Sequence, residues 1–306
     1  MKARFLLPAL ILLVLIFAPF LLDRETKELN ESTRGSLGGS FVKLSDGYVH
    51  YEWKGPASGQ VVVFVHGFTM PYFIFDSVAG DLNRAGFRTL QFDLYGRGFS
   101  DRPETIYNPD LFDREMTELF GALEIKKPVF LVGTSMGGIV TTTFALRHRE
   151  KVAKLILIAP AGFPIEIPVS GRIGRLPLVG DYIMKTLGDV LLLRGTLTSF
   201  YGKPPEDFLS RFEQAASYRG FKRAILSSLR NMPLESAGSL YEDLGKSNIP
   251  LLLIWGQDDR VVSFSLSDGA RKVLPRARFV PLEHIGHVPH YEAPDRVAPL
   301  ILSFIK

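Results

Sequence analysis

The chain has 306 residues, which is enough for one large α/β domain or two small ones. Its 36 Lys and Arg and 32 Asp and Glu give a formal net charge of +4. No basic run of the kind found in nucleic-acid-binding proteins is present, so we expect no nucleic-acid partner. Cysteine is absent, which excludes a disulfide framework, a thiolate metal site and a cysteine nucleophile.

The N-terminal residues 1–22 are predicted to be a transmembrane anchor or a signal peptide. Lys2 and Arg4 precede an uncharged apolar run, 5–22, which is just long enough to cross a bilayer as a helix. We favour the uncleaved anchor because Ala18-Pro19-Phe20 is a poor cleavage site. Positive charge before the span predicts a cytoplasmic N-terminus and an exported catalytic domain on the non-cytoplasmic side. Secretion after signal cleavage is the alternative.

The next segment, 23–40, is rich in charge, Ser and Gly and is predicted to be a polar stalk. From residue 41 the pattern changes to strands. Residues 41–44 and 48–53 flank Ser45-Asp46-Gly47, which predicts a hairpin.

Apolar strands then alternate with helical stretches as far as Pro160. The continuous apolar character of 60–65 is typical of a strand in a sheet that is buried on both faces. This alternation predicts an α/β fold with a mostly parallel sheet and helices on both faces. The predicted strands are 60–65, 88–93, 128–132 and 154–159, and the helical stretches are 73–85, 109–123 and 139–147.

The pattern breaks at residues 161–245, which show helical periodicity interrupted by Gly and Pro. Strands resume at 250–255 and 278–282. A helical insertion between strands of one sheet predicts a cap, placed after the sixth strand and above the strand ends where ligands bind. The core is therefore expected in two parts, 41–160 and 246–306, around a cap at 161–245.

The sharpest local pattern is Gly-x-Ser-x-Gly, which falls on Gly133, Ser135 and Gly137. An apolar strand precedes it and a helical run follows. This context is typical of the strained strand–turn–helix that presents a nucleophilic serine. Glycine is needed on both sides of Ser135 because neighbouring backbone leaves no room for side chains.

A nucleophilic serine needs a base and an acid that orients the base. The loop after the last strand holds His284, His287 and His290. We favour His287, because the preceding Gly286 gives the loop freedom to direct the imidazole toward the serine; the other two histidines remain alternatives. Asp258 and Asp259 follow the preceding strand. Neighbours on an extended chain point in opposite directions, so only one of the two can face the histidine.

Two backbone amides are expected to bind the oxyanion of a tetrahedral intermediate. The amide that follows the nucleophile belongs to Met136. The second comes from the loop after the first long parallel strand, where Phe68 follows His66 and Gly67.

These motifs together resemble the α/β-hydrolase superfamily over residues 41–306. The resemblance includes the His-Gly motif, the loop Asp93-Leu94-Tyr95-Gly96-Arg97-Gly98-Phe99-Ser100, the serine elbow, Gly256-x-x-Asp259 and Gly286-His287. It implies that the acid is Asp259, three residues after the glycine, rather than Asp258. Among capped members, the chain is similar to monoacylglycerol-lipase-like esterases and to meta-cleavage-product hydrolases.

The resemblance implies a serine hydrolase with the triad Ser135, Asp259 and His287, acting without a metal or cofactor. We expect a membrane-anchored enzyme that cleaves a lipid-like carboxylic ester, such as a monoacylglycerol. The alternatives are a carbon–carbon bond hydrolase and a non-catalytic binding protein with a hydrolase-like fold.

Overall fold

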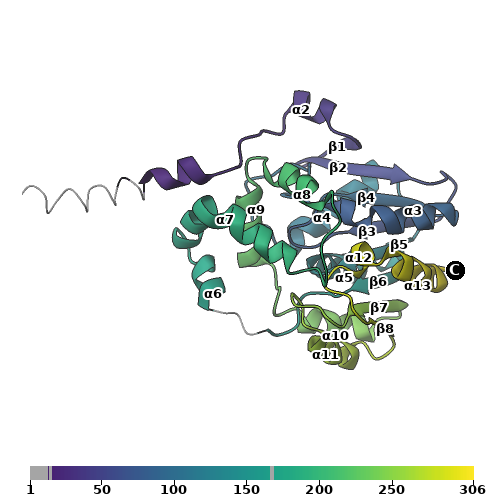
Figure 1. Cartoon of the computed structure of the whole chain (residues 1–306). Coiled ribbons are helices and arrows are strands. Elements are labelled where there is room, and N and C mark those ends of the chain that lie inside the picture. The colour runs from purple at the N-terminus through teal and green to yellow at the C-terminus, as the bar shows by residue number, and fades with distance from the viewer. Residues whose placement is uncertain (1–12, 14–15, 166–168) are drawn as a thin grey trace, which may run out of the picture.

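The computed structural model describes residues 13, 16–165 and 169–306, and its centre is an eight-stranded sheet (Figure 1). The strand order is β1-β2-β4-β3-β5-β6-β7-β8. The first two pairings, β1 with β2 and β2 with β4, are antiparallel, and all the others are parallel. The strands are β1 Ser40–Leu44, β2 Gly47–Lys54, β3 Val61–Val65, β4 Arg88–Phe92, β5 Val129–Thr134, β6 Val152–Ile158, β7 Leu251–Gly256 and β8 Arg278–Leu282.

The central strands are buried on both faces. On β3, Val62 and Phe64 join one apolar cluster, while Val63 and Val65 join the other. This alternation follows from the two-residue period of a strand, and it explains why the strand is apolar throughout. The prediction of a mostly parallel sheet with helices on both faces is confirmed.

Two helical layers cover the sheet. On one side α4 contacts α5, and α10 contacts α5 and α11; on the other side α13 and α12 contact α3. The elements of the core are η1 Tyr72–Phe75, α3 Asp76–Arg84, α4 Pro109–Ala122, α5 Met136–Arg147, η2 Arg149–Lys151, α10 Gly238–Lys246, η3 Phe264–Leu266, α11 Ser267–Val273, α12 Pro289–Glu292 and α13 Pro294–Ile305.

Four of the helices between β6 and β7 form the cap. They are α6 Val169–Arg175, α7 Val179–Leu197, α8 Phe208–Ala216 and α9 Phe221–Asn231. Of these, α6, α7 and α9 lie to the left of the sheet in Figure 1. The inner side of the cap is apolar: Phe208, Phe212 and Phe221 are almost fully buried and belong to the same cluster as one face of the sheet. The cap is thereby fixed to the core by burial of apolar surface.

The membrane location predicted from the N-terminus is contradicted. In the part of the chain that the structure describes, no helix is both long and apolar enough to cross a bilayer. The rest of the predicted span, at residues 1–12 and 14–15, lies outside the described residues.

The segment predicted to be a polar stalk, 23–40, contains α2 Glu31–Ser36 and contacts the cap. The carboxylate of Glu25 accepts hydrogen bonds from the backbone amides of Gly220 and Lys222, at the start of α9. The Lys222 ammonium lies 2.7 Å from Asp23. A carboxylate at the N-terminus of a helix is favourable because the first amides of the helix have no internal acceptor.

Candidate active site

Ser135 lies between β5 and α5 in a strained backbone conformation, with φ +52° and ψ −122°. Positive φ is uncommon for residues other than glycine. A side chain at position 133 would meet Thr141 Oγ1 at 2.4 Å, and one at position 137 would meet the Val65 carbonyl at 2.3 Å. A side chain at either of these two positions would therefore collide with neighbouring atoms.

Hydrogen bonds on both sides hold the strained residue. The Ser135 amide donates to the Ile158 carbonyl at 3.0 Å, and the Ser135 carbonyl accepts from Gly138 and Ala161 at 2.9 and 3.1 Å. These bonds tie the elbow to β6 and to the first turn of α5. The strain at Ser135 is thus maintained by the surrounding structure, which is typical of functional sites.

The structure brings His287 and Asp259 together. His287 Nδ1 lies 2.7 Å from Asp259 Oδ2, and both side chains are buried. The other carboxylate oxygen of Asp259 accepts from the amides of Val261 and Val262 at 2.8 and 2.9 Å. These two amides fix the carboxylate, so its bond to Nδ1 directs the opposite nitrogen, Nε2, away from Asp259.

The neighbouring candidates lie elsewhere. Asp258 accepts a hydrogen bond from the His284 backbone amide at 3.1 Å, so its carboxylate stabilises the loop. The His284 ring is exposed and lies beside Tyr201. His290 is buried and stacks on Phe75 with ring centroids 4.5 Å apart. Its two ring nitrogens have no hydrogen-bond partner among the described residues, and burial lowers its pKa to about 3.

Phe68 and Met136 carry the two amides that the sequence predicts as donors to an oxyanion. Within the described residues, neither amide donates to a protein acceptor. Met136 is the first residue of α5, where a backbone amide has no partner inside the helix. Gly67 brings the Phe68 loop close to the elbow, because a side chain at position 67 would lie 3.1 Å from Ser135 Cβ.

The buried side chain of His66 holds the loop that carries Phe68. Its Nδ1 lies 2.9 Å from the Gly67 carbonyl, and its Nε2 accepts from the Leu94 amide at 3.0 Å. The ring must therefore be neutral, with the proton on Nδ1. Burial is the main reason why the pKa of His66 falls to about 4, which agrees with this assignment.

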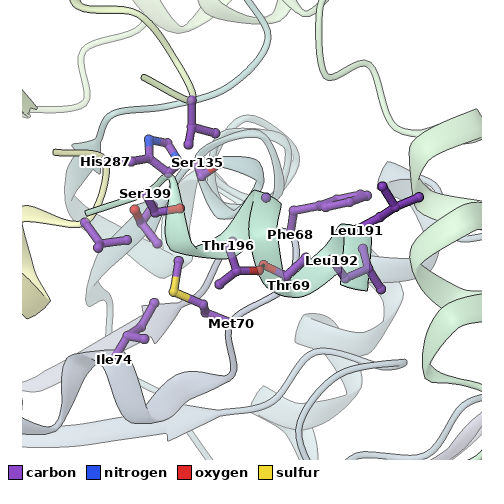
Figure 2. Close-up of a pocket in the computed structure, with 15 residues that line it drawn as sticks. Phe68, Thr69, Met70, Ile74, Ser135, Leu191, Leu192, Thr196, Ser199 and His287 are labelled. Carbon is purple, nitrogen blue, oxygen red and sulfur yellow. Dashed lines mark hydrogen bonds between the residues drawn. The ribbon is translucent and has the colours of Figure 1, made fainter. Parts of the chain in front are cut away.

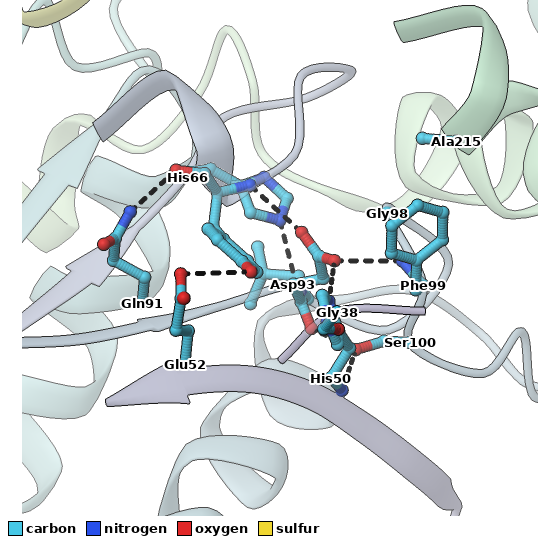
Figure 3. Close-up of polar contacts among 12 residues, drawn as sticks. Gly38, His50, Glu52, His66, Gln91, Asp93, Gly98, Phe99, Ser100 and Ala215 are labelled. Atoms are coloured by element: carbon cyan, nitrogen blue, oxygen red, sulfur yellow. Dashed lines mark hydrogen bonds and ion pairs between the residues drawn. The ribbon is translucent and has the colours of Figure 1, made fainter. Parts of the chain in front are cut away.

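Asp93 organises the loop beside His66 (Figure 3). Its carboxylate accepts from the amides of Tyr72 and Phe99 at 3.0 and 2.9 Å and lies 2.8 Å from His50 Nδ1. The other ring nitrogen of His50 faces the Gly38 carbonyl at 2.7 Å. Burial opposes a charge on His50, but the bond to Asp93 outweighs it and raises the pKa of His50. This ion pair holds the loop that carries Arg97.

Arg97 is a residue that the sequence analysis did not single out, although it lies in the Asp93–Ser100 motif. Its guanidinium is fully buried and donates to the Phe68 carbonyl at 3.0 Å, the Tyr95 carbonyl at 3.3 Å and Ser228 Oγ at 2.8 Å. Burial lowers the pKa of Arg97 to about 10, so the side chain stays charged at neutral pH. Arg97 thus connects the Phe68 loop with cap helix α9.

A second connection joins the cap to the histidine loop. The His287 amide donates to the Ser199 carbonyl at 2.7 Å. The Glu292 carboxylate accepts from the amides of Tyr201 and Gly286 at 2.8 and 3.0 Å. Burial raises the pKa of Glu292. Only the fold reveals the bonds to Ser199 and Tyr201, because these residues are far from the histidine loop in the sequence.

Ser135 and His287 line the same cavity, of about 220 Å³ (Figure 2). Cap helix α7 forms one wall; Thr196 on this helix and Ser199, two residues beyond its end, supply polar groups. Most of the other lining side chains are apolar: Phe68, Met70, Ile74, Leu191, Leu192, Val261 and Val288. A mainly apolar cavity with a few convergent polar groups is the usual form of a small-molecule site.

The fold and this arrangement define the class of protein. The model of the alpha/beta hydrolase family matches residues 62–300, so the chain belongs to that family and is a hydrolytic enzyme. The predicted resemblance is confirmed.

Three known proteins are similar to this chain in sequence or structure. Lipase 1 of Psychrobacter immobilis is 26% identical over 266 residues, which is 83% of this chain and 79% of that protein. Monoacylglycerol lipase ABHD6 of Mus musculus is 29% identical over 192 residues, covering 59% of this chain and 55% of that protein. The structure of a thermophilic esterase from Thermogutta terrifontis is similar with a TM-score of 0.72 and 21% identity, over 87% of this chain and 98% of that one. At this identity the esterase supports the fold alone.

Proposed function

We propose that the chain is a serine hydrolase that cleaves carboxylic esters with an apolar acyl chain. The observation that carries the proposal is the shared cavity: Ser135, on its strained elbow, and His287, held by buried Asp259, both line one mainly apolar pocket. This combination supplies a nucleophile, an oriented base and a binding site for the substrate.

The reaction follows from these positions. Ser135 Oγ attacks the ester carbonyl carbon while its proton passes to His287 Nε2. Asp259 holds the proton on Nδ1 and stabilises the imidazolium. The amides of Phe68 and Met136 bind the negative oxygen of the tetrahedral intermediate. When the intermediate collapses, the alcohol leaves with the proton from His287, and the acyl group remains on Ser135. Water then attacks the acyl group by the same route and releases the acid.

Apolar walls and the relatives support a lipid-like substrate. The lining side chains would bury an acyl chain, and each buried methylene contributes about 0.8 kcal/mol. Lipase 1 and monoacylglycerol lipase ABHD6 are named for lipid esters. We therefore infer that an ester of the monoacylglycerol type is the substrate class.

The test combines covalent labelling with turnover. A fluorophosphonate should label the wild-type protein, and S135A should lose both labelling and hydrolysis of p-nitrophenyl esters. Labelling that persists in S135A would exclude Ser135 as the nucleophile. A wild-type protein that neither reacts with the probe nor hydrolyses any ester would instead support a non-catalytic role. A preference for acetyl over longer acyl groups would exclude the lipid-like substrate.

A further inference from the structure

A second cavity, of about 200 Å³, lies between cap helices α7, α8 and α9 and Arg24 of the N-terminal segment. Its walls include the buried side chains of Phe212 and Phe221, together with Leu193 and Ala216. Polar groups line the rest of it: Arg24, Asp189, Glu213 and Ser217. The apolar part of the cavity is suited to the end of an apolar chain, and the mechanism described above does not use it.

One side chain belongs to both cavities. On helix α7, Leu191 and Thr196 line the catalytic cavity, and Asp189 and Leu193 line the second one. Leu192 lines both. Leu192 is therefore the residue at which the two cavities adjoin.

Leu192 lies at the end of the catalytic cavity that an acyl chain on Ser135 would reach last. Figure 2 shows Leu191 and Leu192 beside Phe68 and Thr69, well away from Ser135 and His287. An acyl chain attached to Ser135 that extends along the cavity toward α7 would meet Leu192 with its methyl end. A longer chain could continue past Leu192 into the second cavity.

We propose that Leu192 is a specificity-determining residue that closes the acyl pocket against the second cavity and so limits the length of the acyl chain. The inference rests on the proposed esterase function and adds a residue that sets its chain-length preference. The two cavities have similar volumes, so removing the partition would roughly double the space for the acyl group.

The experiment measures kcat/KM for p-nitrophenyl esters of increasing acyl length and compares the ratio of long to short esters within each variant. In the wild type, kcat/KM should rise with length and then fall once the chain reaches Leu192. In L192A the maximum should move to longer acyl chains. Each additional methylene buried in the second cavity should raise kcat/KM about fourfold relative to the wild type.

Two variants separate a partition from a general loosening of the site. L193A removes a neighbouring leucine that lines the second cavity alone, and it should leave the position of the maximum unchanged. The double variant L192A/A216F fills the second cavity and should return the maximum to the wild-type length. L192V trims the same side chain by one carbon and should give a smaller shift in the same direction, so it serves if L192A unfolds.

The proposal is overturned if L193A and L192A change the profile equally, or if A216F has no effect in the L192A background. A crystal structure of L192A after reaction with a long-chain alkyl fluorophosphonate gives a direct view. The alkyl chain should reach Phe212 and Phe221 in L192A and end at Leu192 in the wild type. If esters are hydrolysed but the length profile of L192A is not shifted, only the proposed role of Leu192 is refuted. If both turnover and fluorophosphonate labelling are absent, the proposed function is refuted as well.

Discussion

Replacement of Arg97 tests how the oxyanion loop is held. The guanidinium donates to the carbonyl of Phe68, the residue whose amide we assign to the oxyanion. In R97M the buried volume stays filled, but this bond is lost, together with those to Tyr95 and Ser228. Arg97 does not touch the substrate in this scheme, so its role is that of a positioning residue.

The size of the effect follows from one bond. A hydrogen bond from a charged donor contributes about 1.5–3 kcal/mol. If that free energy is used to hold the Phe68 amide in place for the transition state, its loss lowers kcat by about 10- to 150-fold. KM should change little, because the interaction with the oxyanion is formed only in the transition state.

The assay determines kcat and KM for a short-chain ester, with the concentration of active enzyme taken from fluorophosphonate titration. R97K retains the charge but cannot span all three oxygen acceptors, so its loss should be intermediate. S228A removes the partner on the cap and leaves the bond to Phe68, so it should lose less kcat than R97M. If R97M lowers the melting temperature while kcat per active site stays within about twofold of the wild type, Arg97 is purely structural and the reasoning is refuted.

Two further predictions concern the acid and the buried histidine. D259N should lower kcat about 10⁴-fold, because an amide next to Nδ1 favours the wrong tautomer of His287. D258N alters a bond to the His284 backbone and should lower kcat far less. If D258N lowers kcat more than D259N does, Asp258 is the acid of the triad. His290 has its pKa lowered to about 3, so below about pH 6.5 the unfolded chain binds a proton that the native state does not. The free energy of unfolding should therefore fall as the pH decreases from 6.5 toward 3, by about 2 kcal/mol at pH 5. H290F, measured by urea denaturation at pH 7 and pH 5, should remove this part of the acid sensitivity; an unchanged difference between the two pH values would contradict the assignment.

Much of the core was predictable because its signals are local. The glycines at 133 and 137 are needed by contacts within a few ångströms of the elbow, so the pattern carries its own structural reason. Apolar runs such as β3 indicate a strand buried on both faces. The pairing of Asp259 rather than Asp258 with His287 came from the family resemblance, and the structure brings the same two residues together.

Features that depend on distant contacts were not predictable. Arg97 lies in a recognised motif, yet its partner Ser228 is 131 residues away, and nothing in the motif indicates that partner. The predicted membrane location was wrong for another reason: among the described residues, no helix is both long and apolar enough to span a bilayer. The composition of residues 23–40 likewise does not indicate the contacts of Glu25 with the start of α9, which depend on the folded cap.

Hydrogen bonds connect the cap directly to the catalytic loops. Ser199, at the end of α7, accepts from the His287 amide, and Arg97 joins Ser228 of α9 to the Phe68 loop. Helix α7 also carries Leu192, the proposed limit of the acyl chain. A substrate that pushes α7 outward would therefore disturb the base as well as the binding pocket. Acyl chains that exceed the pocket should consequently lose kcat in addition to binding, which is the opposite of what a passive apolar groove would give.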